Sequence, residues 1–173
     1  MNSNKLKAIE TYYRGYHFRS RTEARWSVYF DAMSMPFDYE REGFKLPSGW
    51  YLPDFWLREL QTWAEVKGQD FSKTEAQLCY ELAQLTHHDC LMLHGAPDLR
   101  TYAGFWWNSE GRLEHGHALV CGRWELIWQA GAPIQVPANP PNDGLDYFEQ
   151  AIHTARAARF EHGAVQPYNW SKP

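Results

Sequence analysis

The chain has 173 residues, of which 44% are hydrophobic and 16% aromatic, and its formal net charge at pH 7 is −4. This composition is typical of a globular protein with its own core and excludes a disordered or collagen-like chain. The apolar runs are too short to span a membrane, the N-terminus lacks an apolar signal core, and the three cysteines have no paired spacing, so we expect a cytoplasmic protein that does not enter a membrane.

The acidic total hides a basic N-terminal part. Six basic residues against two acidic ones give residues 1–30 a charge of +4, so the remaining residues carry −8; the basic ones are Lys5, Lys7, Arg14, Arg19, Arg21 and Arg25. Clustering of positive charge matters more for nucleic-acid binding than the total charge does. A DNA partner is therefore compatible with the acidic net charge.

The first predicted helix follows an extended segment. Residues 11–18 are aromatic and contain a glycine, which predicts extended rather than helical chain. Ser20, with Glu23 three positions later, matches a Ser-x-x-Glu capping box, and Pro36 cannot continue a helix. The pattern predicts an amphipathic helix from Ser20 to about Ser34.

Three arginines, Arg19, Arg21 and Arg25, lie at the start of this helix, the last two sharing a face four residues apart. They could contact the phosphates of a nucleic acid, or they could form an ordinary solvated basic surface. We favour phosphate contact, because this helix is expected to border two carboxylates, Asp54 and Glu65, in the strands that follow.

Residues 37–46 predict a first strand or a ragged hairpin, which would pair with a hairpin over residues 50–68. In the second hairpin a four-residue connector at 58–61 separates two runs rich in aromatic and β-branched residues. If Leu57 faces Thr62 across this connector, residues whose numbers sum to 119 lie opposite each other.

This register places Asp54 directly across from Glu65, with Lys67 on the same strand face and Val66 pointing into the core. Like charges in opposed positions, with Cβ atoms about 4.5–5.5 Å apart, are destabilising unless something neutralises them. Mg²⁺ is a hard cation that proteins hold through one or two carboxylates, and it can activate water and neutralise charge on phosphorus. Together, Asp54, Glu65 and Lys67 predict a magnesium site that acts on a phosphodiester. A salt-bridged surface hairpin would show the same pattern.

The next segment predicts a crossover to a parallel strand. Residues 72–87 have helical periodicity, and residues 90–94 form a short apolar run typical of a strand buried on both faces. A strand, a helix and a strand in succession imply a right-handed parallel connection. The predicted order is α-β-β-β-α-β, an α/β fold with a mixed central sheet.

The sequence around the two carboxylates resembles the PD-(D/E)xK nuclease superfamily, which has the restriction-endonuclease-like fold with an αβββαβ core. The resemblance covers roughly residues 11–95, and Pro53-Asp54 and Glu65-Val66-Lys67 match the superfamily's signature residue by residue. Further similarity lies in Gly-Phe-x-Leu at 43–46, Tyr-Leu-Pro-Asp-Phe-Trp-Leu at 51–57 and Trp-x-Glu-Val-Lys-Gly at 63–68.

The resemblance implies a metal-dependent deoxyribonuclease of phage or mobile-element type. Asp54, Glu65 and the backbone carbonyl of Val66 would bind Mg²⁺, for which Mn²⁺ should substitute, and Lys67 would orient or deprotonate the attacking water. Glu23 matches the acid that many members carry on the first core helix, and its role in the capping box is an equally good interpretation. Expected partners are DNA and other subunits of a phage or mobile-element machinery, and a homodimer would suit cleavage of both strands.

Some members of the superfamily carry a Gln-x-x-x-Tyr motif on the second helix, where this chain has Gln77 and Tyr80, one residue short. Lys73 and Gln77 are candidates for nucleic-acid contact at helical spacings, but an ordinary helix surface is the favoured interpretation. A ribonuclease, or a non-catalytic subunit that binds DNA or protein, would have the same fold. The intact signature argues against loss of activity.

Beyond Pro97 the resemblance fades. Residues 1–98 are expected to form the nuclease core, and residues 99–173 a β-rich extension with a C-terminal helix, packed with the core as one domain. Two or three strands are predicted within residues 101–129. The extension holds several tryptophans, which could stack on unpaired bases but are better explained by packing against the main sheet: Trp106, Trp107, Trp124 and Trp128.

His115, His117 and Cys121 lack a fourth ligand and a regular spacing, so a zinc site is not favoured. The four prolines within residues 130–144 predict an irregular linker, and a last helix is expected to run from there to about Glu161.

Overall fold

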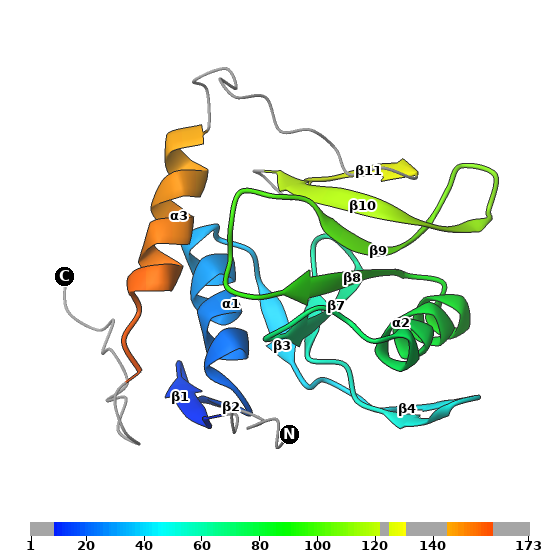
Figure 1. Cartoon of the computed structure of the whole chain (residues 1–173), viewed down its shortest axis with the longest axis horizontal. Coiled ribbons are helices and arrows are strands. Elements are labelled where there is room, and N and C mark those ends of the chain that lie inside the picture. Colours follow the sequence, from blue (N-terminus) through cyan, green and yellow to red (C-terminus); the bar gives the residue numbers. More distant parts are fainter. Residues whose placement is uncertain (1–8, 122–124, 131–144, 161–173) are drawn as a thin grey trace, which may run out of the picture.

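The computed structural model describes residues 9–121, 125–130 and 145–160. Within these residues the protein is mixed α/β, with three helices and a mixed, mostly antiparallel central sheet of seven strands (Figure 1). The strands are β1 (Thr11–Tyr13), β2 (Tyr16–Phe18), β3 (Phe37–Tyr39), β4 (Phe44–Leu46), β5 (Gly49–Tyr51), β6 (Phe55–Leu57), β7 (Thr62–Lys67), β8 (Asp89–His94), β9 (Tyr102–Trp107), β10 (Leu113–Cys121) and β11 (Glu125–Ala130), and the helices are α1 (Arg21–Ala32), α2 (Lys73–Thr86) and α3 (Leu145–Ala157).

The strand order in the central sheet is β11-β10-β9-β8-β7-β6-β3. The predicted trio of antiparallel strands is confirmed, because β6 pairs antiparallel with both β3 and β7. The predicted parallel crossover is confirmed as well, since α2 connects β7 to β8 and these two strands pair in parallel. The elements α1, β3, β6, β7, α2 and β8 therefore follow the predicted order, with the β4–β5 hairpin inserted.

Alternation along β7 sends its side chains into two separate cores. Ala64 and Val66 belong to the core that contains the buried face of α1, whereas Trp63 belongs to the core that contains the buried face of α2. Glu65 and Lys67 share the parity of Trp63, so they project on the α2 side of the sheet.

Helices α1 and α2 each begin at a serine cap. The Ser20 hydroxyl accepts the Glu23 backbone N–H, as predicted, but the Glu23 carboxylate reaches the N–H of Arg19 rather than that of Ser20, so the predicted capping box is only half formed. A complete capping box is found instead on α2, between Ser72 and Glu75. Each cap of this kind stabilises a helix by about 0.5–2 kcal/mol.

Two expectations for the strands are corrected. Residues 44–46 do not continue the first strand, and the central hairpin begins at Phe55 rather than at residue 50, because β4 and β5 pair only with each other. This small hairpin is held on α2 by Glu81, whose carboxylate accepts the backbone N–H and the hydroxyl of Ser48 at 2.9 and 2.6 Å.

Residues 11–18 are extended, as expected, and form a hairpin of their own. Its two-residue turn, Arg14-Gly15, has positive φ at both positions, the geometry that matches the twist of a tight hairpin.

The strands beyond residue 98 extend the same sheet at its β8 edge. The Trp106 and Trp128 rings stack with centroids 5.2 Å apart, and the Trp128 indole N–H donates to Asp89 at 3.0 Å. The Trp107 indole N–H donates to the Ala83 carbonyl at 3.2 Å. These contacts agree with the packing interpretation of the tryptophans; Trp124 lies outside the described residues.

Helix α3 lies antiparallel beside α1 (Figure 1). Near its start, the Tyr147 hydroxyl donates to the carbonyl of Ala32 at 2.7 Å, and near its end Arg156 Nε donates to the carbonyl of Pro97 at 2.9 Å. The predicted last helix is thus present with slightly shorter bounds, while the proline-rich segment before it falls among residues 131–144, outside the described residues.

Among the described helices, none combines the length and the apolar character needed to cross a membrane.

Candidate functional site

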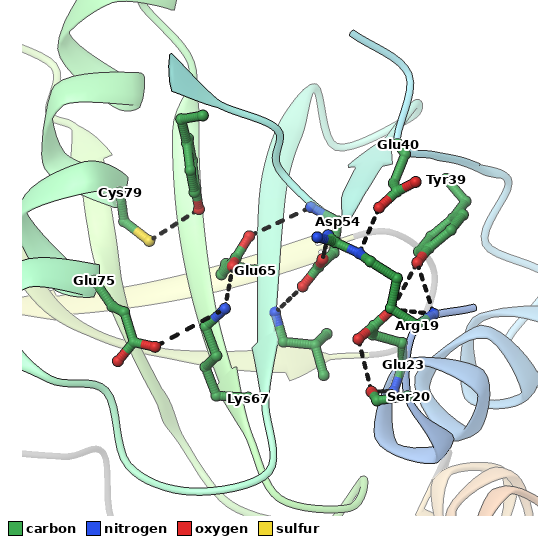
Figure 2. A network of polar contacts seen from close by, with 12 residues as sticks. Arg19, Ser20, Glu23, Tyr39, Glu40, Asp54, Glu65, Lys67, Glu75 and Cys79 are labelled. Carbon is green, nitrogen blue, oxygen red and sulfur yellow. Dashed lines mark hydrogen bonds and ion pairs between the residues drawn. The ribbon is translucent and has the colours of Figure 1, made fainter. Parts of the chain in front are cut away.

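The predicted register of the central hairpin is confirmed. Leu57 lies opposite Thr62 and Phe55 opposite Ala64, so residues whose numbers sum to 119 face each other. Asp54 is the residue just before β6 and continues this register: its backbone N–H donates to a carboxylate oxygen of Glu65 at 3.4 Å. The two predicted acids are therefore neighbours across the hairpin (Figure 2).

The Asp54 carboxylate is almost completely buried, with 2% of its side chain exposed. Its Oδ2 accepts the Val66 backbone N–H at 2.7 Å, and its Oδ1 accepts a guanidinium N–H of Arg19 at 2.8 Å. Burial, and then the negative charges of Glu65 and Glu23, raise the pKa of Asp54 well above its ordinary value. The ion pair with Arg19 offsets only part of this, because that side chain is 56% exposed and shared with Glu40.

Glu65 and Lys67 form a close ion pair on the α2 side of the sheet. Lys67 Nζ lies 2.6 Å from Glu65 Oε1 and 4.0 Å from the carboxylate of Glu75 at the start of α2 (Figure 2). Burial acts to lower the pKa of Lys67, but the charge of Glu65 and the hydrogen bond to it outweigh burial and raise this pKa above its ordinary value. The lysine is therefore held as an ammonium group.

A buried tyrosine borders Glu65 from the inserted hairpin. The Tyr51 hydroxyl lies 3.7 Å from Cys79 Sγ on α2. Burial raises the pKa of Tyr51, and the neighbouring Cys79 and Glu65 raise it further, so the phenol keeps its proton. Sequence reasoning missed Tyr51, because only the packing of β5 against α2 brings it to the site.

Glu23 comes from α1 and is also buried. One of its carboxylate oxygens accepts the Tyr39 hydroxyl at 2.6 Å and the Arg19 N–H at 3.1 Å, and the other accepts the Ser20 hydroxyl at 2.7 Å. Glu23 is close enough to Asp54 to raise the pKa of that acid. Both interpretations of Glu23 thus have a geometric basis: it belongs to the helix cap, and it belongs to the acidic group.

Arg19 links the acids of this group. Its Nε lies 2.6 Å from Glu40 Oε1, while another guanidinium nitrogen binds Asp54 (Figure 2). Burial acts to lower the pKa of Arg19, but the hydrogen bond with Tyr39 and the charges of Asp54 and Glu40 outweigh it and raise the pKa. Tyr39 and Glu40 were not predicted, since nothing in their local pattern marks them.

The remaining predicted nucleic-acid contacts lie elsewhere. Arg21 and Arg25 are two residues to either side of Glu23, which places them about 160–200° around the helix from it. They face the end of α3, where they line a pocket. On α2, Lys73 is exposed and the Gln77 amide donates to Glu81 at 3.0 Å. Among the described residues, no hydrogen bond or ion pair joins any of these four residues to Glu23, Asp54 or Glu65.

A metal with oxygen ligands fits the residues present. No group of three or more His, Cys, Asp or Glu side chains suited to a metal occurs in the described parts of the chain. Mg²⁺, however, usually binds protein through one or two carboxylates and takes its other ligands from water and substrate. Asp54 and Glu65 supply that pair, and both carboxylates are buried next to each other.

The histidine pair of the extension shows no third ligand within the described residues. The rings of His115 and His117 lie with centroids 6.4 Å apart, and burial, followed by His117, lowers the pKa of His115. The side chain of Cys121 lies outside what the structure describes.

Comparison of this chain with protein-family models, with curated proteins and with solved structures gives no match.

Proposed function

We propose that this protein is a metal-dependent nuclease of the PD-(D/E)xK type that hydrolyses phosphodiester bonds in DNA. The observation that carries the proposal is the buried Asp54 carboxylate placed against Glu65, with the Lys67 ammonium beside Glu65. Two acids held together in a buried position favour the binding of a cation beside them, in addition to the contacts that Arg19 and Lys67 already make. The order of α1, β3, β6, β7, α2 and β8, which is that of a restriction-endonuclease-like core, supports the same proposal.

The acids would hold the metal from two strands. Asp54 and Glu65 would supply carboxylate oxygens and Val66 its backbone carbonyl; the hydrogen bond from the Val66 N–H fixes the orientation of the Asp54 carboxylate. When bound, Mg²⁺ supplies an acidified water and positive charge beside phosphorus. Mn²⁺ should support the same chemistry, because both ions prefer oxygen ligands.

Lys67 would act on the phosphoryl oxygens. Its raised pKa makes it a cation at neutral pH, so it is suited to donate hydrogen bonds to the charge that develops on phosphorus rather than to remove a proton. Its side chain is 32% exposed, so a substrate can reach it. Of the two roles that the sequence left open, the geometry supports orientation of water and substrate by the ammonium group.

Glu23 would complete the acidic group from the helix side. Tyr39 and Ser20 donate hydrogen bonds to its two oxygens, so its carboxylate is held in place without a metal. From this position it adds negative potential at Asp54 and thereby favours a cation there.

The test is a cleavage assay with purified protein, Mg²⁺ or Mn²⁺, and duplex, single-stranded, branched and RNA substrates. Wild type is expected to cleave DNA, and Asp54→Asn and Glu65→Gln to be inactive. Asp38→Asn is the matched control, since Asp38 lies on the neighbouring β3 but pairs with Arg58 rather than with the acids. Cleavage of RNA alone would make the protein a ribonuclease. Absence of cleavage with every substrate would favour a non-catalytic binding subunit.

The proposal also covers partners. DNA is the expected substrate, other proteins of a phage or mobile element are expected to act with it, and a homodimer would allow both strands to be cut. Size measurement with and without duplex DNA distinguishes a monomer from a dimer.

A further inference from the structure

A pocket of about 690 Å³ lies between the start of α1 and the end of α3. Figure 1 shows how the two parts meet: the helices run antiparallel, and the chain that leaves α3 continues down beside the start of α1. The pocket is lined by Arg21 and Arg25 from α1, by Arg156 from the last turn of α3, and by Arg159 and Phe160 just after that helix. Four guanidinium groups thus surround one concavity.

Within the described residues, three of these four arginines have no acidic partner. Arg156 pairs with Asp98 at 2.8 Å and donates to the carbonyl of Pro97. Arg21 and Arg25 each have a buried Nε with no hydrogen-bond partner, and among the described residues no acid forms an ion pair with them or with Arg159. A buried donor without a partner is costly, and like charges held together repel each other. Both features favour an anion as the occupant of this pocket.

The chemistry of the lining indicates which anion. The guanidinium group of an arginine can donate two parallel hydrogen bonds to two oxygens of a phosphate. Several arginines together favour a group with more than one negative charge. The volume is that of a site for a whole small molecule, since such sites span about 300–1,000 Å³, and it exceeds what a single phosphate needs. Phe160 and two neighbouring alanines form an apolar wall beside the arginines. A ligand with an anionic end and a flat apolar part matches both the arginines and the apolar wall.

We propose that this pocket binds a nucleotide through its phosphate groups, with Arg21 and Arg25 as the main contacts and the base near Phe160. Two sources of that chemistry exist: the 5′-phosphorylated end of a nucleic-acid strand and a free nucleoside polyphosphate. The site lies on the side of α1 opposite to Glu23 and does not depend on the proposed nuclease activity.

The test measures binding by calorimetry in excess EDTA, so that cleavage plays no part. The probes are pyrophosphate, ATP, adenosine, and one single-stranded oligonucleotide with either a 5′-phosphate or a 5′-hydroxyl. Wild type should bind ATP or the 5′-phosphorylated strand saturably, and adenosine much more weakly. Arg21→Gln and Arg25→Gln should each weaken this binding about tenfold or more, as loss of a charge-assisted hydrogen bond does.

Arg112→Gln is the matched control, because it removes the same charge from an exposed arginine that pairs only with Glu110. It should bind like wild type. A preference for the 5′-phosphate over the 5′-hydroxyl strand identifies the strand end as the ligand, and tighter binding of ATP than of either strand identifies the free nucleotide.

Three results would overturn the proposal: no saturable binding of any phosphate probe, adenosine binding as tightly as ATP, or binding that is unchanged in both α1 variants. If these variants do not fold, Arg159→Gln, at an exposed residue just after α3, takes their place. A second measurement needs no variant, since ATP or pyrophosphate must raise the melting temperature of wild type by mass action. Absence of that shift at millimolar ligand would count equally against the site.

Discussion

The Val66 backbone N–H donates a hydrogen bond of 2.7 Å to the carboxylate of Asp54 on the adjoining segment of the hairpin. This bond ties together two of the three groups proposed to hold a metal, and it is set by the register of β6 and β7 rather than by flexible side chains. A one-residue slip of that register would turn Asp54 and Glu65 to opposite faces of the sheet. The hairpin connector therefore determines whether the site exists.

Lys67→Ala should slow cleavage much more than it weakens binding. The ammonium lies outside the proposed ligand set but next to Glu65, at 2.6 Å. Loss of one preorganised electrostatic contact costs about 10²–10³ in rate, or roughly 2.7–4 kcal/mol. Single-turnover cleavage should fall by at least that factor, while DNA affinity measured in Ca²⁺ stays close to that of wild type. Lys67→Arg should not restore the rate, because a planar guanidinium has a different shape.

The control for this experiment is Lys73→Ala, which removes an exposed lysine six residues away on α2. It is expected to cleave at a rate near that of wild type. Lys67→Ala cleaving as fast as Lys73→Ala would show that the ammonium takes no part in the chemistry.

The raised pKa of Asp54 predicts how the metal-free stability depends on pH. Because the folded pKa lies above the unfolded value of about 3.9, the folded state binds more protons between the two values, and stability must increase as the pH falls through the folded pKa. Asp54→Asn lacks this contribution. The difference in unfolding free energy between wild type and Asp54→Asn, measured with urea and EDTA from pH 8 to pH 5, should therefore move in favour of wild type as the pH falls.

Asp38 provides a control, because its contribution to stability should change with pH in the opposite direction. The hydrogen bond from Arg58 lowers the pKa of Asp38, so the stability that this acid contributes is present above its unfolded pKa and is lost as the pH falls. Asp38→Asn should thus be most destabilised, relative to wild type, near neutral pH. Equal pH dependence in the two asparagine variants would contradict the raised pKa of Asp54.

The central part of the fold was predictable from the sequence because its signals are local. The length of the hairpin connector sets the register that opposes Asp54 and Glu65, and helical periodicity marks α1 and α2. The short β4 and β5 were misjudged, since three-residue strands carry little pattern of their own. Their position depends on the contact between Ser48 and Glu81, which are 33 residues apart.

The same difference between local signals and long-range contacts explains which residues of the site could be predicted. Asp54, Glu65 and Lys67 lie within one hairpin, so arithmetic on the register is enough to group them. Tyr39, Glu40 and Tyr51 join them only through packing between elements, and no spacing in the sequence indicates it. For a related reason, the sequence did not indicate that Arg21 and Arg25 line a pocket with residues 156–160, because that depends on where α3 packs.

Gly104→Ala tests the packing of the extension against the sheet. A Cβ at this position would lie 2.5 Å from the Cys90 carbonyl oxygen and 2.6 Å from the Trp128 ring. Backbone on one side and a packed indole on the other leave little room to adjust, so the free energy of unfolding should fall by about 1–3 kcal/mol. Gly68→Ala is the control, because its nearest neighbour is 3.8 Å away. Equal stability of Gly104→Ala and Gly68→Ala in urea would mean that Trp128 does not pack against β9 at this position.

Arg19→Gln should increase the affinity of the site for Mg²⁺. The Arg19 guanidinium binds Asp54 at 2.8 Å and so competes, by its contact and by its charge, with a cation at that carboxylate. Two unit charges about 4 Å apart repel by roughly 4 kcal/mol at an effective dielectric constant of 20, but solvent around a half-exposed side chain screens most of this. A gain on the order of tenfold in metal affinity, about 1.4 kcal/mol, is therefore expected from calorimetric titration.

The matched control is Arg58→Gln, an equal loss of charge at an exposed arginine that pairs with Asp38 instead. It should leave metal affinity unchanged. If Arg19 moves from Asp54 to a substrate phosphate once the metal is bound, Arg19→Gln should bind Mg²⁺ more tightly and yet bind DNA more weakly in Ca²⁺, a combination that a simple loss of folding cannot produce. Weaker Mg²⁺ binding in Arg19→Gln would contradict the interpretation that Arg19 competes with the metal for Asp54. It would mean that the arginine holds Asp54 in position for the metal.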